Sequence, residues 1–191
     1  MIDQTGLGWV ELGAAIKRRR ADAGLTLVEL ARLVELSQPF LSQVENGRAH
    51  PSMRSLARIA AALDTTPQAL FGRQAHSGVV VQRHTEAPVI MIAAALGSVC
   101  RPLVAGDAPF HVMEYDHLSG EYLDWWEHDG FEAALVIRGR VEAQIGDEVI
   151  ELGAGDVATY DARRPHRHRS IGRTPAHLLL IETAGVHRGE G

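Results

Sequence analysis

The sequence predicts two domains of different fold class: an all-α head of five helices over residues 1–72 and an all-β closed barrel over residues 85–185. Up to residue 71, apolar residues recur every three or four positions, which is typical of helices. From residue 79 they alternate with polar residues, which is typical of strands. Residues 73–84 are expected to form a linker and a first strand, and 191 residues suffice for two such domains.

The composition indicates a cytoplasmic protein with no membrane partner. No apolar run approaches the ~20 residues of a membrane-spanning helix. The segment MIDQTGLGWVELG lacks the basic start and the apolar stretch of a signal peptide. Cys100 is the only cysteine, so an internal disulfide and a metal site built on paired cysteines are both excluded.

The first expected helix spans residues 9–23 and buries Leu12, Ala15 and Ile16. A second helix over residues 25–34 begins with a capping box, in which Thr26 and Glu29 satisfy each other's backbone amides. Towards the end of the head, Ser52 is expected to cap a fourth helix that reaches Leu63. Thr66 and Pro67 begin a short fifth helix that ends at Gly72.

The third helix is the distinctive element of the head. Ser37 is its expected N-cap, Leu36 and Leu41 can form a hydrophobic staple, and Gly47 can end it in the left-handed conformation. Leu41 and Val44 point inward. The opposite face is almost free of charge and carries Gln38, Pro39, Ser42, Gln43 and Asn46. Such a face either hydrogen-bonds base edges in a major groove or is a plain solvated helix surface.

Two capped helices joined by about three residues form a helix-turn-helix unit, whose second helix enters the groove. The motifs LTLVELA, SQPFLSQVENG and HPSMRSLARIAAAL together resemble the XRE family of phage-repressor and Cro-like regulators over residues 12–71. The resemblance implies contacts to double-stranded operator DNA from Ser37, Gln38, Pro39, Ser42, Gln43, Asn46 and Arg48. Base contacts are implied for Gln38, Pro39, Ser42 and Gln43, and phosphate contacts are implied near Asn46 and Arg48. The resemblance also implies an ion pair between Arg20 and Glu45. Leu27 departs from the family, which often has a phosphate-binding Gln at this position.

Charge is distributed unevenly between the two halves. Residues 1–72 carry a net charge of +1 and the remainder carries −6. DNA binding therefore depends on the local placement of Lys17, Arg18, Arg19 and Arg48, and the acidic half is expected to face away from DNA.

The second half is expected to contain short strands separated by glycine turns such as IRGRV, IGDEV and LGAGDV. The candidate strands are residues 79–82, 89–95, 111–115, 133–137, 141–145, 149–152, 157–160 and 177–182. So many short strands without a helical pattern indicate a closed antiparallel sandwich or barrel. Residues 96–109 are ambiguous.

Two segments of this half, HDGFEAALVIRG and GAGDVATYDARRPHRHRS, resemble the two motifs of the cupin family of double-stranded β-helix barrels. The first family motif supplies two His and a Glu, and the second supplies one His. His128, Glu132 and His166 match three of these positions, and Trp126 stands where the other His is expected.

Trp126, His128, Glu132 and His166 are therefore interpreted as the ligand pocket. Trp126 and His128 share strand parity and are both expected to point into the barrel. The two imidazoles and the carboxylate suit divalent Fe, Mn, Ni or Zn with open positions. Alternatively, Trp126 fills the place of the missing ligand and the other three hydrogen-bond to one another or to an organic effector. His168 shares the parity of His166 and either substitutes as a ligand or lines the wall.

Together the two resemblances imply a sequence-specific transcriptional regulator whose barrel senses a small molecule or a metal. A homodimer would bind operator half-sites about 34 Å apart, or a multiple of that. The alternative is an Fe(II)-type oxygenase or epoxidase with a helix-turn-helix head. Some cupin oxygenases, including a phosphonate epoxidase with a similar head, use the same His, Glu and His order. A third interpretation is a scaffold or antitoxin-like repressor without a ligand. We expect a regulator rather than an enzyme, because the recognition face is intact and the metal set lacks one member.

Overall fold

The computed structural model describes residues 5–71, 79, 81–93, 98–104 and 108–183. The chain divides into two compact units, Met1–Ile90 with Arg101–Asp107 and Met91–Cys100 with Ala108–Gly191. The expected linker over residues 73–84 stays a prediction, because residues 72–78 and 80 lie outside the described part. Among the described residues, no helix is both long and apolar enough to cross a membrane.

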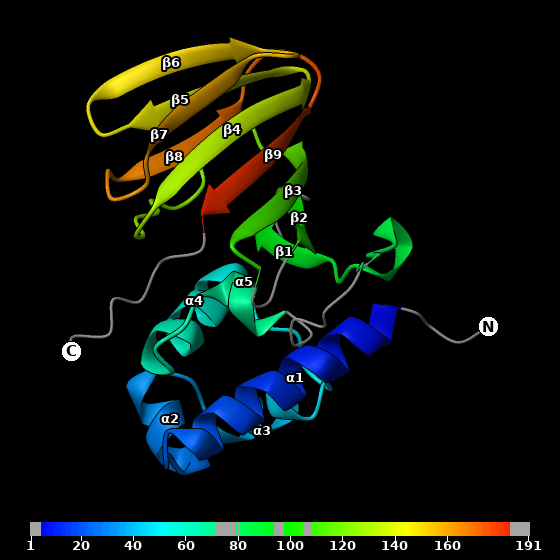
Figure 1. Cartoon of the computed structure of the whole chain (residues 1–191), viewed down its shortest axis with the longest axis vertical. Helices are drawn as coiled ribbons and strands as arrows, with labels where there is room; N and C mark the ends of the chain where they lie inside the picture. Colours follow the sequence, from blue (N-terminus) through cyan, green and yellow to red (C-terminus); the bar gives the residue numbers. More distant parts are fainter. Residues whose placement is uncertain (1–4, 72–78, 80, 94–97, 105–107, 184–191) are drawn as a thin grey trace. The chain divides into compact units, whose positions relative to one another are not determined.

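The first unit contains the five predicted helices (Figure 1), namely α1 (Thr5–Asp22), α2 (Leu27–Leu33), α3 (Gln38–Glu45), α4 (Met53–Ala62) and α5 (Pro67–Leu70). The capping box of Thr26 and Glu29 is present at the start of α2. Ser37 caps α3 by accepting a hydrogen bond from the amide of Phe40 at 3.3 Å. Ser52 caps α4 through its hydroxyl in the same manner. These caps confirm the predicted helix starts, since each satisfies an amide that the helix itself leaves free.

The fifth helix also begins as predicted, with the hydroxyl of Thr66 accepting a hydrogen bond from the amide of Ala69. Its C-cap is Phe71, and the predicted end at Gly72 lies outside the described residues. The predicted inward side of α1 is confirmed as well, because Leu12 and Ile16 are at most 1% exposed.

One predicted strand is wrong. Residues 79, 81 and 82 form no strand, and residue 80 is not described. The chain instead makes a 3₁₀ turn, η1 (His84–Glu86), before its first strand β1 (Ile90–Ala93). Within the segment that the sequence left ambiguous, Ser98–Val104 forms strand β2. At residues 79, 81 and 82, which the structure describes, alternation is therefore not accompanied by pairing with another strand.

The remaining strands are β3 (Phe110–Leu118), β4 (Phe131–Arg138), β5 (Arg140–Ile145), β6 (Glu148–Gly153), β7 (Val157–Asp161), β8 (His166–Ser170) and β9 (Ala176–Thr183). A six-stranded sheet has the order β1-β2-β3-β9-β4-β7, and a three-stranded sheet has the order β6-β5-β8 (Figure 1). The pairings of β3 with β9, of β4 with β7 and β9, and of β5 with β6 and β8 are all antiparallel. The predicted all-β class is confirmed.

Alternating side chains form the core of this barrel. Ala134 and Val136 of β4 and Val141 and Ala143 of β5 are fully buried. The segment before β4 continues the smaller sheet, because Trp126 and His166 exchange two backbone hydrogen bonds of 2.9 and 2.8 Å. This pairing brings the first cupin-like motif beside the second.

Candidate DNA-binding face and barrel site

The outer face of α3 lies as the sequence predicts. Gln38, Pro39, Gln43 and Asn46 are exposed, and Ser42 is half-buried. Part of the face is already engaged, because the side-chain amide of Asn46 donates a 2.7 Å hydrogen bond to the carbonyl of Ser42. The two Gln side chains are thus the long uncharged groups that this face presents to solvent.

The inner side of α3 is fixed tightly. Leu41 and Val44 are at most 1% exposed. A Cβ atom on Gly13 of α1 would collide with the carbonyl oxygens of Val44 and Glu45. The backbones of α1 and α3 therefore approach so closely that only glycine fits at position 13. The sequence reasoning missed this contact, although a glycine inside a helix was a visible signal.

An ion pair completes the attachment of α3. Nε and Nη2 of Arg20 donate to the two carboxylate oxygens of Glu45 at 2.6 and 3.0 Å, as the family resemblance implied. Nη1 of Arg20 also donates to the carbonyl of Leu25 at 2.8 Å. The hydrogen bonds that Arg20 donates to Glu45 raise the pKa of Arg20 above its ordinary value, and the guanidinium stays charged. Arg48 follows the helix and is exposed.

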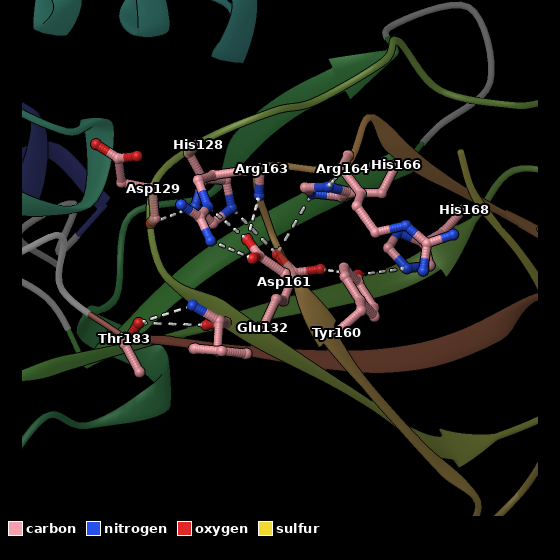
Figure 2. A network of polar contacts seen from close by, with 11 residues as sticks. His128, Asp129, Glu132, Tyr160, Asp161, Arg163, Arg164, His166, His168 and Thr183 are labelled. Atoms are coloured by element: carbon pink, nitrogen blue, oxygen red, sulfur yellow. Dashed lines mark hydrogen bonds and ion pairs between the residues drawn. The ribbon is translucent and has the colours of Figure 1, made fainter.

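The barrel brings three predicted residues together (Figure 2). Nε2 of His128 lies 3.4 Å and Nε2 of His166 lies 3.7 Å from Oε2 of Glu132. One ligand atom from each of the three residues lies within 4.8 Å of the others. Glu132 comes from β4 and His166 from β8, whereas His128 is held in the preceding segment by a 3.0 Å hydrogen bond from its amide to Ala162.

Backbone carbonyls orient both imidazoles. Nδ1 of His166 lies 2.9 Å from the carbonyl of Arg164, and Nδ1 of His128 lies 3.2 Å from that of Asp129. When Nδ1 carries the proton and donates it to a carbonyl, Nε2 keeps its lone pair as a possible metal ligand. The donor set therefore fits a divalent cation, which two imidazole nitrogens and one carboxylate oxygen can hold with open positions.

Two further side chains belong to this site, and one of them was not predicted. Tyr160 of β7 donates a hydrogen bond to Oε1 of Glu132 and lies 3.1 Å from Nε2 of His168 (Figure 2). His168 does not join the group of possible ligands formed by the described residues. Tyr160 leaves Oε2 of Glu132 directed at the two other imidazoles. The second cupin-like motif contains Tyr160 but gave it no role, because that role depends on the register of β7 against β4.

The electrostatics of the site follow from burial and from the two carboxylates nearby. Burial alone would lower the pKa of His128, but the hydrogen bond to Glu132 and the charges of Glu182 and Glu132 raise it to about 9. Burial favours the neutral form of Glu132, yet His128, His168 and His166 together lower its pKa. Burial lowers the pKa of His168 to about 4, so this imidazole is neutral at physiological pH.

Trp126 and the basic loop complete the surroundings. Because Trp126 is the bridge partner of His166, their side chains lie on the same face of the sheet. Arg163 pairs with Asp161 at 2.5 Å, and Arg164 pairs with Glu148 at 2.6 Å. The two arginines next to His166 are thus already engaged with carboxylates.

Comparisons with known proteins agree with this architecture. Residues 11–71 match the family described as "Helix-turn-helix domain", and residues 117–182 match the family described as "Cupin domain". The protein therefore combines a helix-turn-helix domain of the XRE type with a cupin domain.

Individual relatives are more distant. The Immunity repressor protein of Bacillus phage phi105 is 35% identical over 63 residues, which are 33% of this chain and 44% of the repressor. The chain spans about half the length of the curated relatives it matches. The crystal structure of an HTH_3 family transcriptional regulator from Vibrio cholerae shares the fold, with a TM-score of 0.61 and 19% identity over 94% of this chain and 98% of that one. The hydroxypropylphosphonic acid epoxidase from S. wedmorenis is less similar, with a TM-score of 0.48 and 22% identity over 92% of this chain and 97% of its own.

Proposed function

We propose that this protein is a cytoplasmic transcriptional regulator that binds operator DNA with the outer face of α3 and senses a metal or a small molecule in its barrel. The observation that carries the proposal is the exposed, uncharged face of α3, anchored from behind by buried Leu41 and Val44. Gln side chains can read adenine through N6 and N7 in the major groove. The similarity to a phage immunity repressor over 63 residues supports the same proposal.

The test is DNA binding measured by fluorescence anisotropy at physiological salt. The full chain should prefer a duplex from its own upstream region over a random duplex. Gln43→Ala should relax this preference by about 1–3 kcal/mol at one base pair, whereas Gln82→Ala, which changes an exposed Gln outside the helices, should not. If the wild-type protein binds both duplexes with equal affinity, the proposal of a sequence-specific regulator is refuted.

Arg48 offers an independent test of orientation. If Arg48 contacts a phosphate, Arg48→Ala should weaken binding to all duplexes alike and reduce the salt slope by about one. If Arg48→Ala instead weakens binding only to duplexes that carry one particular base pair, Arg48 contacts a base in the groove and not a phosphate.

We further propose that two copies pair through the outer face of the six-stranded sheet. Phe131 and Ile137 of β4, Phe110 of β3 and Val157 of β7 alternate with inward residues and are each between 44% and 57% exposed. Exposed large apolar side chains on one sheet face are typical of a protein–protein contact. A dimer would also present two α3 helices to a palindromic operator.

Sedimentation of Phe131→Lys tests this pairing. The variant should sediment as a monomer while Val149→Lys, which changes an exposed apolar side chain of the other sheet, should remain a dimer. If both variants sediment as the same oligomer, the dimer interface does not lie on the outer face of the six-stranded sheet.

The second candidate function is a metal-dependent oxygenase. It is favoured by one observation, the cluster of His128, Glu132 and His166 with its ligand atoms within 4.8 Å. This set corresponds to the two imidazoles and one carboxylate of non-haem Fe(II) enzymes. Anaerobic Fe(II) titration followed by oxygen uptake with candidate substrates tests it. His166→Ala should abolish Fe(II) binding, and His177→Ala, which changes a His paired with Glu114, should not. Oxygen uptake unaffected by His166→Ala would exclude this site as its source.

A further inference from the structure

The connection between β3 and β4, residues 119–130, borders the barrel site and is called the strap here. Its amides at Trp126 and His128 donate to the carbonyls of His166 and Ala162 at 2.9 and 3.0 Å. Trp126 pairs with His166 as an isolated bridge and not as part of a continuous strand. The strap is about twice as long as the usual connection of ~4–6 residues. Separate hydrogen bonds therefore attach a long segment to the barrel.

The cluster is open to solvent on the side of the strap. The side chain of His128 is 28% exposed, whereas those of Glu132 and His166 are 1% and 2% exposed. An ion cannot reach Glu132 and His166 unless part of the surrounding chain moves. Continuous antiparallel ladders hold β4 and β8, which carry these two residues. Because opening a ladder breaks many hydrogen bonds together, the strap is the part that opens at the least cost.

An arginine of β8 fastens the strap on the outside of the barrel. Arg167 lies outward, since the residues on either side of it in the strand are buried. Its Cζ atom lies 4.2 Å from the ring centroid of Trp125 and 4.0 Å from that of Tyr122, and both rings belong to the strap. Nε and Nη2 of Arg167 also donate to Oε1 of Gln144 at 2.9 and 2.7 Å, which fixes the guanidinium. Because a cation is attracted to the face of a ring, the hydroxyl of Tyr122 is not part of this contact.

We propose that the strap is a cover that opens to admit a divalent cation to the barrel site, and that Arg167 is the latch that holds it closed. Trp125 contacts Arg167 outside the barrel, whereas the next residue, Trp126, pairs with His166. Because the two tryptophans are adjacent in the chain, loss of the outer contact also loosens the inner one. This inference rests on the proposed metal sensing by the barrel and does not depend on DNA binding.

Hydrogen exchange of the metal-free, full-length protein, followed by mass spectrometry, tests the latch. In Arg167→Gln the segment with Trp126 and His128 should exchange about 5- to 30-fold faster, which is the factor that two partly exposed cation–π contacts supply. Arg140→Gln is the matched control. Arg140 is an exposed arginine of the same sheet and pairs with Glu151 at 2.5 Å. Exchange of the strap should be unchanged in this control.

Trp125→Leu removes the contact from the side of the strap, and it decides the matter if Arg167→Gln does not fold. This variant should also accelerate exchange. The double variant should exchange about as fast as Arg167→Gln alone, because both changes remove the same contact. Unchanged exchange in both single variants, or two effects that multiply in the double variant, would overturn the latch.

The rates of metal uptake and release test the cover. Metal-free protein is mixed with Zn(II), and protein loaded with Zn(II) is mixed with excess chelator. In Arg167→Gln both rates should rise about 5- to 30-fold, while the affinity changes little, because a cover slows entry and exit alike. Both rates should stay unchanged in Arg140→Gln.

Two results would overturn the cover and leave the metal site intact. One is unchanged metal rates in a variant whose strap exchanges faster, and the other is a change in affinity without a rise of both rates. A wild-type protein that binds no Zn(II) would overturn the inference together with metal sensing. The anisotropy experiment would still decide DNA binding separately.

Discussion

The hydroxyl of Tyr160 holds one carboxylate oxygen of Glu132 and leaves the other directed at two imidazoles. This arrangement makes Glu132 a candidate ligand through a single oxygen. His168 in turn lies 3.1 Å from the Tyr160 hydroxyl and orients it. The chain from His168 through Tyr160 to Glu132 therefore supports the cluster from behind, as hydrogen-bonded partners of metal ligands generally do.

Tyr160→Phe should loosen this support. We expect metal affinity to fall about tenfold or more, because Glu132 would rotate freely between orientations. Tyr122→Phe is the control, since Tyr122 donates to Glu142 and stacks under Arg167 away from the cluster. Isothermal titration of both variants with a divalent cation measures the difference. An unchanged affinity in Tyr160→Phe would show that Glu132 is held without its partner.

How much of this site was predictable depends on how local each contact is. Thr26 and Ser37 cap helices within three residues of themselves, so sequence spacing suffices to find them. His128, Glu132 and His166 were found through the spacing of the cupin motifs. Tyr160 was not, because it reaches Glu132 only through the register of β7 against β4.

Two strands, β8 and β2, were also not predicted, because local sequence patterns do not reveal them. The inner face of β8 carries His166, His168 and Ser170, so apolar alternation could not reveal that strand. Arg101 and Pro102 interrupt the pattern of β2, which the sequence left ambiguous. In both strands, partner strands rather than local propensity decide the structure.

The pH dependence of stability should reflect His128. In the metal-free protein its pKa is raised from 6.5 to about 9 by Glu132 and Glu182, against the opposing effect of burial. A raised folded-state pKa stabilises the protein fully below 6.5, and this contribution is lost as the pH rises through about 9. The free energy of unfolding, measured with urea, should therefore decrease between these two values.

His128→Gln should remove much of that decrease, since Gln does not titrate. His117→Gln is the control, because the His117 side chain is exposed and forms an ion pair with Asp116, far from the two carboxylates in sequence. A wild-type protein whose unfolding free energy is constant across this range would contradict the coupling of His128 to the two carboxylates.

The Arg20–Glu45 pair should matter far more for stability than the exposed Arg58–Glu35 pair of the same unit. The side chains of Arg20 and Glu45 are 14% and 4% exposed, whereas those of Arg58 and Glu35 are 38% and 82% exposed. Glu45→Ala leaves a guanidinium largely buried without its carboxylate, which costs about 3 kcal/mol or more. Glu35→Ala should cost at most about 1 kcal/mol. Urea unfolding followed by circular dichroism compares the two variants, and equal losses would mean that water replaces Glu45.

A comparison of two glycines of the head distinguishes the cost of backbone strain from the cost of steric collision. Gly24 and Gly47 have nearly the same positive φ, 68° and 67°. A Cβ atom on Gly24 would meet nothing within 4 Å, whereas one on Gly47 would lie 2.8 Å from Cα of Val10. Gly24→Ala should therefore cost only the conformational strain of about 1–2 kcal/mol.

Gly47→Ala carries the same strain and in addition must push the end of α3 away from α1, because Val10 offers backbone atoms that cannot rotate aside. We expect its unfolding free energy to fall by clearly more than that of Gly24→Ala. Since Gly47 directly follows the α3 face, the same displacement should weaken operator binding in Gly47→Ala and leave it unchanged in Gly24→Ala. Thermal unfolding and anisotropy measured on both variants test this. If both variants lose the same stability and the same operator affinity, the end of α3 moves away from Val10 without an additional energetic cost.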